Sequence, residues 1–251
     1  MTTGFEQDMT GRVALVTGGG SGLGRATSRC LAASGATVLV ADVNDAGAAD
    51  TVEQVAADGG SAQAVHLDVT DSAAVDRVLS EAFAEHGDRF DCLVNNAGTD
   101  RGADVPEVTD EQWQAVFGVN VDGPMHTSRA FLQHIGAQGP REWPADIVNV
   151  VSISALTTGA GAGAYNSSKA ALLKLTEVLQ TEVRERNWPA RVCALSPSAM
   201  NTPMMDQWNL PEEKMMDPAG VAALILRAVT LPPSMVLQSM VVTGRTEYYP
   251  R

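Results

Sequence analysis

The chain of 251 residues has few cysteines, few basic residues and only four histidines. Its three cysteines are odd in number and far apart, which excludes a disulfide framework and a paired metal-ligand motif. Lys and Arg number 17 against 30 Asp and Glu, and nucleic-acid or anionic membrane partners need clustered positive charge. Because basic residues are few, we expect no nucleic-acid partner. The histidines are scattered rather than grouped, so we also expect no metal site.

Long apolar runs are also missing. No uninterrupted apolar stretch reaches the length that crosses a bilayer, and residues 1–10 lack the basic-then-apolar pattern of a signal peptide. These absences predict a cytoplasmic protein without a membrane partner. What is present, 45% hydrophobic and 19% charged residues, is typical of a globular protein with a sizeable core.

Short β-branched runs alternate with longer amphipathic segments along most of the chain. Strands spaced by helices predict right-handed βαβ units and a parallel sheet covered on both faces. With no internal repeat and no low-complexity linker, we expect one α/β domain over residues 1–251, a Rossmann-type doubly wound sheet. The predicted strands are 13–17, 37–41, 62–67, 92–95, 147–151, 192–195 and 236–242, and the predicted helices 23–34, 45–57, 73–85, 111–135, 165–187 and 218–230.

Two segments break this alternation. Residues 136–145 are rich in Pro and Gly and indicate a loop. Residues 201–216 carry four Met, two Pro and Trp208 without a clean period. A long irregular segment in a compact domain is often a lid or a binding loop. Because the second segment is so apolar, we expect it to cover a substrate.

The first predicted strand runs into the glycine-rich segment 17–24, which opens the first predicted helix. Glycines let the backbone turn tightly and approach a pyrophosphate, whose charge the helix N-terminus favours. Asp42 follows at the end of the second strand, 24 residues beyond Gly18, where a carboxylate binds adenosine ribose hydroxyls and repels a 2′-phosphate. Val43 offers no compensating charge, so the pattern favours NAD over NADP. The alternative is that Asp42 only begins a turn.

Further motifs follow in order: Asn-Asn-Ala-Gly at residues 95–98, then Asn120, then Ser152, then Tyr165 and Lys169 four residues apart. With these residues in place, the sequence resembles the short-chain dehydrogenases/reductases from about residue 11 to 204. That family's Thr-Gly-x-x-x-Gly-x-Gly loop matches residues 17–24, and its Tyr-x-x-x-Lys motif matches residues 165–169. Ser152 precedes the tyrosine by 13 residues, a usual spacing in the family.

The chemistry of the last group follows from residue types. On a helix, positions i and i+4 share a face, so Lys169 can lie beside Tyr165. A nearby ammonium and a positively charged nicotinamide favour the phenolate of Tyr165, whose reference pKa of about 10 is too high for a base near neutrality. Ser152 can bind the substrate oxygen, although Ser154 is a candidate for the same role. The resemblance implies that Asn120 holds a water of a proton relay, whereas a purely structural role is to satisfy backbone groups in a helix bend.

The resemblance also implies a set of cofactor contacts. Asp68 matches the residue that contacts adenine, yet it could equally cap the following turn. Pro197 and Thr202 match a Pro-Gly…Thr segment near the nicotinamide, with Ser198 in place of the glycine. The expected cofactor-binding residues are Gly18, Ser21, Gly22, Leu23, Gly24, Asp42, Asp68, Val69, Asn95, Ala97, Gly98, Tyr165, Lys169, Pro197 and Thr202.

The sequence therefore predicts an NAD-dependent oxidoreductase that transfers a hydride between nicotinamide and a secondary alcohol or ketone. The methionine-rich segment and the small residues at 155–164 favour a moderately hydrophobic substrate, with a hydroxyacyl thioester, a steroid and a cyclic alcohol all open. By resemblance we expect a homo-oligomer, a tetramer or a dimer. Two alternatives are a catalytically silent NAD-binding sensor and an NAD-dependent epimerase or dehydratase, for whose larger substrate domain the chain leaves little room.

Overall fold

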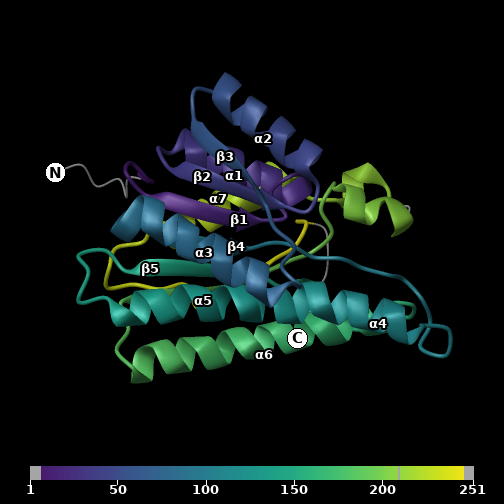
Figure 1. The fold of residues 1–251 in the computed structure, drawn as a ribbon. Helices are drawn as coiled ribbons and strands as arrows, with labels where there is room; N and C mark the ends of the chain where they lie inside the picture. Colours follow the sequence, from purple (N-terminus) through teal and green to yellow (C-terminus); the bar gives the residue numbers. More distant parts are fainter. Residues whose placement is uncertain (1–6, 209, 246–251) are drawn as a thin grey trace.

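Runs of buried β-branched residues form the strands of the computed structural model, which describes residues 7–208 and 210–245 (Figure 1). The described residues do not include 1–6, 209 and 246–251. These positions fall within the domain expected over residues 1–251, and residue 209 also falls within the expected substrate segment. The seven strands are β1 (Val13–Thr17), β2 (Thr37–Asp42), β3 (Ser61–His66), β4 (Phe90–Asn95), β5 (Ala145–Val150), β6 (Ala190–Pro197) and β7 (Ser239–Val242). All are parallel, in the order β3-β2-β1-β4-β5-β6-β7.

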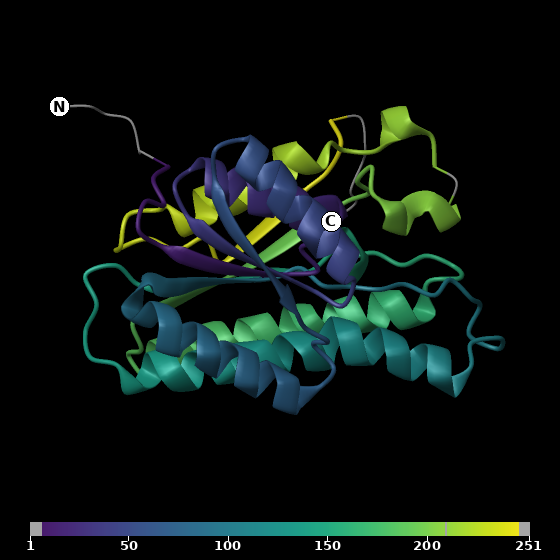
Figure 2. The same ribbon diagram turned by 45° about the horizontal axis from the view of Figure 1, so that its top comes forward.

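Amphipathic helices connect the strands. They are α1 (Gly22–Ala33), α2 (Asp45–Ala57), α3 (Ser72–His86), α4 (Asp110–Phe117), α5 (Gly123–Ala137), α6 (Gly163–Glu185) and α7 (Pro218–Val229). Short helical turns are η1 (Gly87–Arg89), η2 (Gly118–Asp122), η3 (Ile153–Ala155), η4 (Pro203–Trp208) and η5 (Glu212–Lys214). In both ribbon views α1, α2 and α7 cover one face of the sheet, and α3, α5 and α6 cover the other (Figures 1 and 2).

Alternate residues of β1 point into two separate cores, as the two-residue period of a strand requires. Ala14 and Val16 pack into the core under α1 and α7, whereas Val13 and Leu15 pack into the core under α3 and α5. A strand buried on both faces reads as a continuous apolar run, which is what the sequence of β1 shows. The expected doubly wound α/β sheet is therefore confirmed.

Strand order places the ligand crevice. The chain builds outward from β1 through β2 to β3, then returns to add β4 on the other side of β1. Where the order reverses, the loops after β1 and β4 turn to opposite faces and leave a crevice at the carboxyl ends of the strands. The glycine-rich segment and the Asn-Asn-Ala-Gly motif follow these two strands, so they meet at this point.

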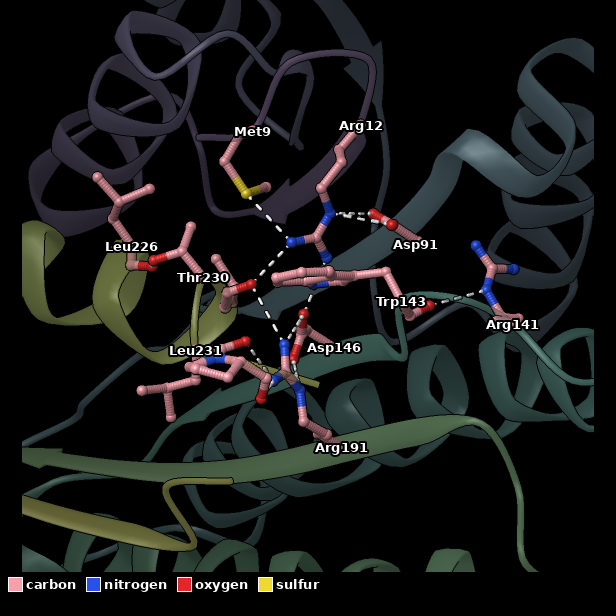
Figure 3. Close-up of polar contacts among 12 residues, drawn as sticks. Met9, Arg12, Asp91, Arg141, Trp143, Asp146, Arg191, Leu226, Thr230 and Leu231 are labelled. Atoms are coloured by element: carbon pink, nitrogen blue, oxygen red, sulfur yellow. Dashed lines mark hydrogen bonds and ion pairs between the residues drawn. The ribbon is translucent and has the colours of Figure 1, made fainter. Parts of the chain in front are cut away.

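The opposite end of the sheet carries a buried ionic network, shown in Figure 3. The guanidinium of Arg12 contacts Asp91 at 2.9 Å and Asp146 at 2.8 Å, and Arg191 contacts Asp146 at 2.8 Å. Arg12 also donates to the carbonyl oxygen of Val229 at 2.7 Å. The network joins residues at the amino ends of β1, β4, β5 and β6, so it fixes the central strands far from the crevice.

The structure confirms a helical segment over the predicted residues 111–135 and adds an internal irregularity. Residues 110–137 are helical without a break, and the π-helical turn η2 lies within them, between α4 and α5. A Cβ on Gly123 would lie 2.6 Å from a methyl group of Val69, so the chain approaches the loop after β3 closely at this bend. A sequence period cannot register the extra residue of a π turn, because the apolar positions continue beyond it.

The bounds of β1 agree with the prediction, and those of the other six strands in the described residues differ by one to three residues. Ala145, expected in the loop, is the first residue of β5, and β7 begins at Ser239 rather than at residue 236. None of the described helices is both long enough and apolar enough to cross a membrane. Within the same described ranges, His, Cys, Asp and Glu form no group of three that could hold a metal ion.

Candidate active site

A cleft of about 790 Å³ lies at the carboxyl ends of the strands, between the loop after β1 and the segment after β6. It brings together segments that lie more than 180 residues apart in the chain. Fourteen of the sequence-predicted site residues line it: Gly18, Ser21, Gly22, Leu23, Asp42, Asp68, Val69, Ala97, Gly98, Ser152, Tyr165, Lys169, Pro197 and Thr202. Gly24, Asn95 and Asn120 do not.

The phenol of Tyr165, in the first turns of α6, lies beside the hydroxyl of Ser152, which opposes the rise of the phenol's pKa that burial causes. Ser152 follows β5 by two residues, and its Oγ accepts a 3.1 Å hydrogen bond from the backbone N–H of Ser154. Both serines line the cleft, but it is Ser152 that affects the pKa of the phenol. An alcohol oxygen placed in this pocket could therefore reach two hydroxyl groups at once.

Lys169 lies one turn further along α6 with 3% of its surface exposed. Its Nζ donates to the carbonyl oxygen of Val150 at 3.0 Å and lies 5.7 Å from the centre of the Tyr165 ring. Burial lowers the pKa of Lys169 to about 8 and raises the pKa of Tyr165 to about 12. Both shifts favour the neutral form, because burial penalises charge. A cation bound in the cleft would move the phenol towards its anion.

Asn120 is fully buried in the π turn. Its Oδ1 accepts from the N–H of Thr99 at 2.8 Å, and its Nδ2 donates to the carbonyl oxygen of Thr99 at 2.9 Å and to Ser168 Oγ at 3.0 Å. The side chain thus satisfies backbone groups and ties the loop after β4 to α6. A Cβ on Gly98 would lie 3.4 Å from Asn120 Oδ1 and 3.5 Å from Lys169 Nζ, so the amide stands close behind the lysine.

The loop after β1 is shaped for a close approach of a ligand. Gly18 and Gly22 have φ of +63° and +48°, a region that side chains with a Cβ rarely adopt. A Cβ on Gly24 would lie 2.0 Å from the carbonyl oxygen of Gly18, so Gly24 lets α1 pack against the loop and does not itself line the cleft. Backbone N–H groups at a helix N-terminus, with no side chains in the way, fit the pyrophosphate of a dinucleotide.

Asp42 closes this loop from the end of β2. Its Oδ2 accepts from the N–H of Gly20 at 2.8 Å, and its Oδ1 accepts from the N–H of Asn44 at 2.9 Å. The carboxylate therefore begins a turn, as the alternative interpretation expects, and Asp42 also lines the cleft. Asp68 likewise begins a turn, because its Oδ1 accepts from the backbone N–H and the hydroxyl of Thr70, and it also lines the cleft.

Asn95 requires a correction. Its amide is buried among Thr127, Ser128 and Asn149, with hydrogen bonds of 2.6 to 3.1 Å, so its side chain fixes β4 to β5 and α5 instead of facing a cofactor. The neighbouring Asn96 was not among the expected contacts, yet it lines the cleft and donates to the carbonyl oxygens of Thr17 and Gly18. Strand alternation explains the difference, because adjacent side chains point to opposite sides.

The methionine-rich segment covers the outer end of the cleft. Its ends are held together, since Met216 exchanges backbone hydrogen bonds with Ala199 and Asn201. Five apolar side chains of this part of the chain line the cleft: Met200, Met204, Met205, Trp208 and Leu210. In Figure 2 the two short helices of this segment stand above the teal chain that leads from β4 to α4. Residues of the segment that we expected to be the substrate loop thus line the cleft.

Asp100 is a cleft residue that sequence reasoning missed. It is 6% exposed, and its Oδ2 accepts a hydrogen bond of 3.1 Å from Nε1 of Trp208. The two residues are 108 positions apart. The only local signal was the position of Asp100 two residues after the Asn-Asn-Ala-Gly motif.

Comparisons with known proteins agree with this geometry. The family described as short chain dehydrogenase matches residues 12–213. A 1-deoxy-11-beta-hydroxypentalenate dehydrogenase of Streptomyces avermitilis is 38% identical over 76% of this chain and 69% of its own length. An NAD complex from Burkholderia phymatum has a TM-score of 0.83 and 28% identity, covering 93% of this chain and 89% of its own. An NADP-bound protein of Beutenbergia cavernae has a TM-score of 0.84 and 30% identity, covering 94% and 96%.

The match covers the glycine-rich loop, the Asn-Asn-Ala-Gly motif and the paired Tyr165 and Lys169. These are the residues that the fold gathers at one end of the parallel sheet. The chain is therefore a member of the short-chain dehydrogenase/reductase family of oxidoreductases, which use a nicotinamide cofactor on alcohol or ketone substrates.

Proposed function

We propose that this protein is an NAD-dependent oxidoreductase that transfers a hydride between nicotinamide and a secondary alcohol or ketone of moderately hydrophobic character. The observation that carries the proposal is that Ser152, Tyr165 and Lys169 line one cleft together with the glycine-rich loop, with the ammonium of Lys169 5.7 Å from the centre of the Tyr165 ring. The cofactor-binding residues that line this cleft form the predicted nucleotide site. In the proposal the whole chain acts as one domain, with residues 201–216 as its substrate loop.

In this proposal, side chains of the protein accept and donate the proton of the reaction. In alcohol oxidation the phenolate form of Tyr165 takes the hydroxyl proton and becomes the neutral phenol, and Ser152 donates a hydrogen bond to the same substrate oxygen as charge develops there. The ammonium of Lys169 stabilises the phenolate electrostatically and stays in place through its hydrogen bond to Val150. Asn120 holds the loop after β4 against α6, next to Lys169, through its hydrogen bonds to Thr99 and Ser168. The nicotinamide, when bound, supplies the carbon that accepts or gives the hydride.

The preference for NAD rests on charge. Asp42 lines the cleft at the end of β2, where it would accept hydrogen bonds from ribose hydroxyls and repel a 2′-phosphate. Arg25 is the nearby cation of α1, but its guanidinium is engaged with Asp50 at 2.7 Å and with the carbonyl oxygen of Gly20 at 2.6 Å. A 2′-phosphate would therefore meet the carboxylate of Asp42, while Arg25 is already engaged with Asp50 and Gly20.

The substrate class rests on the lining of the outer cleft. Methionine side chains adapt to irregular apolar shapes, and Trp208 adds a large apolar surface. Residues 157–160 and Ala162 are small and leave room beside Tyr165. These features favour an apolar body around the reacting carbon over a phosphorylated one.

Absorbance of NADH at saturating cofactor tests the proposal across secondary alcohols and ketones, with NADP tried in parallel. We expect turnover that is confined to NAD(H). Turnover with NADP at equal efficiency would contradict the role of Asp42. Tight NAD binding without turnover of any alcohol or ketone would favour the sensor, and isomerisation without net NADH would favour an epimerase.

We also propose a cytoplasmic homotetramer. The side chains of Trp113 on α4 and Val178 on α6 are 38% and 45% exposed, which fits a surface that another subunit covers. The described cysteines, Cys30, Cys92 and Cys193, are all free, as a reducing compartment favours. A monomeric mass by light scattering at micromolar concentration would contradict the assembly.

A further inference from the structure

The carboxylate of Asp100 has one oxygen whose role the proposed chemistry does not explain. Oδ2 accepts the hydrogen bond from Trp208, and the backbone N–H of Arg101 also interacts with the carboxylate. Oδ1 is fully buried and has no well-aligned hydrogen-bond donor among the described residues. Asp100 lines the cleft and is 6% exposed. A buried acceptor without a donor is costly, so such a group in a binding cleft indicates that a ligand supplies the donor.

Asp100 stands close to the reacting groups. Burial, opposed by the hydrogen bond of Ser152, is the main cause of the raised pKa of Tyr165, and the negative charge of Asp100 adds to it. The same charge opposes the burial-induced fall of the pKa of Lys169. A carboxylate that makes the phenolate harder to form does not help the proton transfer itself. Its position is explained if it recognises a second polar group on the substrate.

The surroundings restrict what that group can be. The cleft next to Asp100 is apolar on the side of the substrate loop, where Met204, Met205 and Trp208 line it. The same segment is held to Asp100 by the hydrogen bond that the indole N–H of Trp208 donates. A small donor attached to an apolar body fits this setting, because the donor meets the free oxygen while the body contacts the methionines.

We propose that the free oxygen of Asp100 accepts a hydrogen bond from a second hydroxyl group of the substrate, so that the enzyme prefers diols and hydroxy ketones to simple alcohols and ketones. The inference rests on the proposed function and deepens it. One carbinol carbon of the diol loses a hydride to NAD⁺ and its hydroxyl loses a proton to Tyr165. The products are a hydroxy ketone, NADH and a proton, and the second hydroxyl is unchanged.

The test compares kcat/KM for matched pairs of substrates: 2,3-butanediol with 2-butanol, and cyclopentane-1,2-diol with cyclopentanol. A hydrogen bond to a charged group predicts a preference for the diol of about 10- to 100-fold. In Asp100→Asn, whose amide presents a donor or a weaker acceptor, this ratio should fall to within about threefold of unity. The matched control is Asp104→Asn, which removes a charge from an exposed position of the same loop outside the cleft lining and should keep the ratio.

A second variant separates direct recognition from support of the loop. Trp208→Phe removes the hydrogen bond to Oδ2 but leaves the carboxylate. We expect it to lower kcat/KM for diol and simple alcohol alike. Loss of the diol preference in Trp208→Phe to the same extent as in Asp100→Asn would overturn the proposal, because Asp100 would then act only through the loop.

The outcomes are distinguishable from those of the proposed function. Equal kcat/KM for diol and simple alcohol in the natural protein overturns the role of Asp100 and leaves the oxidoreductase intact. A stronger preference for 1-amino-2-propanol than for 1,2-propanediol overturns the hydroxyl assignment, because an ammonium would then be the donor. If neither alcohols nor diols turn over, the proposed function fails. In that case the fluorescence of bound NADH, titrated with diol in the natural protein and in Asp100→Asn, decides the role of Asp100: equal dissociation constants overturn it, and a weakening of about tenfold in the variant supports it.

Discussion

The ammonium nitrogen of Lys169 lies 5.7 Å from the centre of the Tyr165 ring and donates its hydrogen bond to the carbonyl oxygen of Val150. Helix α6 places the two side chains on one face. The hydrogen bond to Val150, the last residue of β5, fixes the position of the ammonium nitrogen. The lysine therefore acts on the phenol through space, with its charge, and its position depends on the packing of α6 against β5.

Tyr165→Phe should lower kcat by about 100- to 10,000-fold, because the phenol oxygen is the group that exchanges a proton with the substrate. The variant keeps the ring, and the other residues that line the nucleotide end of the cleft are unchanged. NAD binding, measured by calorimetry, should therefore stay within about threefold of that of the natural protein. NADH absorbance gives the rate, and a Phe variant with near-natural turnover would contradict the proposed mechanism.

The buried lysine predicts a pH dependence of stability in the cofactor-free protein. Its pKa is lowered from 10.5 to about 8, so between these values the unfolded chain binds more protons than the folded one. The free energy of unfolding should therefore rise with pH above about 8, relative to Lys169→Met. From pH 8 to pH 10 the difference should grow by about 2 kcal/mol.

We limit the comparison to pH values up to 10, because the titration of Tyr165 changes the free energy of unfolding in the opposite direction above that pH. Its pKa is raised from 10.0 to about 12, so its contribution to stability falls as the pH rises above 10. Urea unfolding at several pH values measures both proteins. Parallel profiles for the natural protein and Lys169→Met between pH 8 and 10 would show that the lysine is not perturbed in the fold.

Asp42→Ala should raise KM for NAD⁺ about tenfold and reduce the discrimination against NADP⁺, because the carboxylate that meets the ribose is lost. Asp45→Ala is the matched control, since it removes an exposed carboxylate three residues away, outside the cleft lining. Initial rates with both cofactors supply the comparison. An unchanged KM in Asp42→Ala would remove the assignment of Asp42 as the cofactor selector.

Asp146→Asn should destabilise the fold by about 3 to 5 kcal/mol, because it leaves the buried guanidinium groups of Arg12 and Arg191 short of a charge partner. The control is Asp58→Asn, which breaks the exposed pair with Arg29 and should cost about 1 kcal/mol or less. Denaturant unfolding measures both variants. Equal losses would mean that the network of Figure 3 contributes no more than a surface pair.

Gly24→Ala should abolish NAD binding or the fold of the loop, because the added methyl would lie 2.0 Å from the carbonyl oxygen of Gly18. Gly220→Ala is the control, since a Cβ in α7 at that position meets no atom within 4 Å and alanine favours a helix. Calorimetric NAD binding and thermal unfolding of both variants test the contrast. Natural affinity in Gly24→Ala would show that the loop can move to accept a side chain.

Local patterns predicted much of the molecule correctly. Apolar runs gave the central strands, and the glycines between β1 and α1 marked the turn at the end of the sheet. The spacing of Tyr165 and Lys169 predicted one helix face. Each of these features depends on residues close together in the chain, and the period of a strand or helix expresses them directly.

The remainder depended on which distant segments meet. Asn95 and Asn96 are neighbours in the motif, yet the register of β4 turns one into the core and the other into the cleft. The π turn at Asn120 lies next to Gly123, where the chain approaches Val69 in the loop after β3. The contact between Asp100 and Trp208 joins residues 108 positions apart.

The sequence by itself determined the order of strands and helices, the glycine-rich turn and the order of the motifs, because these depend on the preferences and spacing of near neighbours. The tertiary structure decided which asparagine faces the cleft, where Lys169 points and which buried oxygen of Asp100 has no well-aligned donor among the described residues. These outcomes depend on the packing of segments that meet only after the sheet has formed, and no local pattern carries that information.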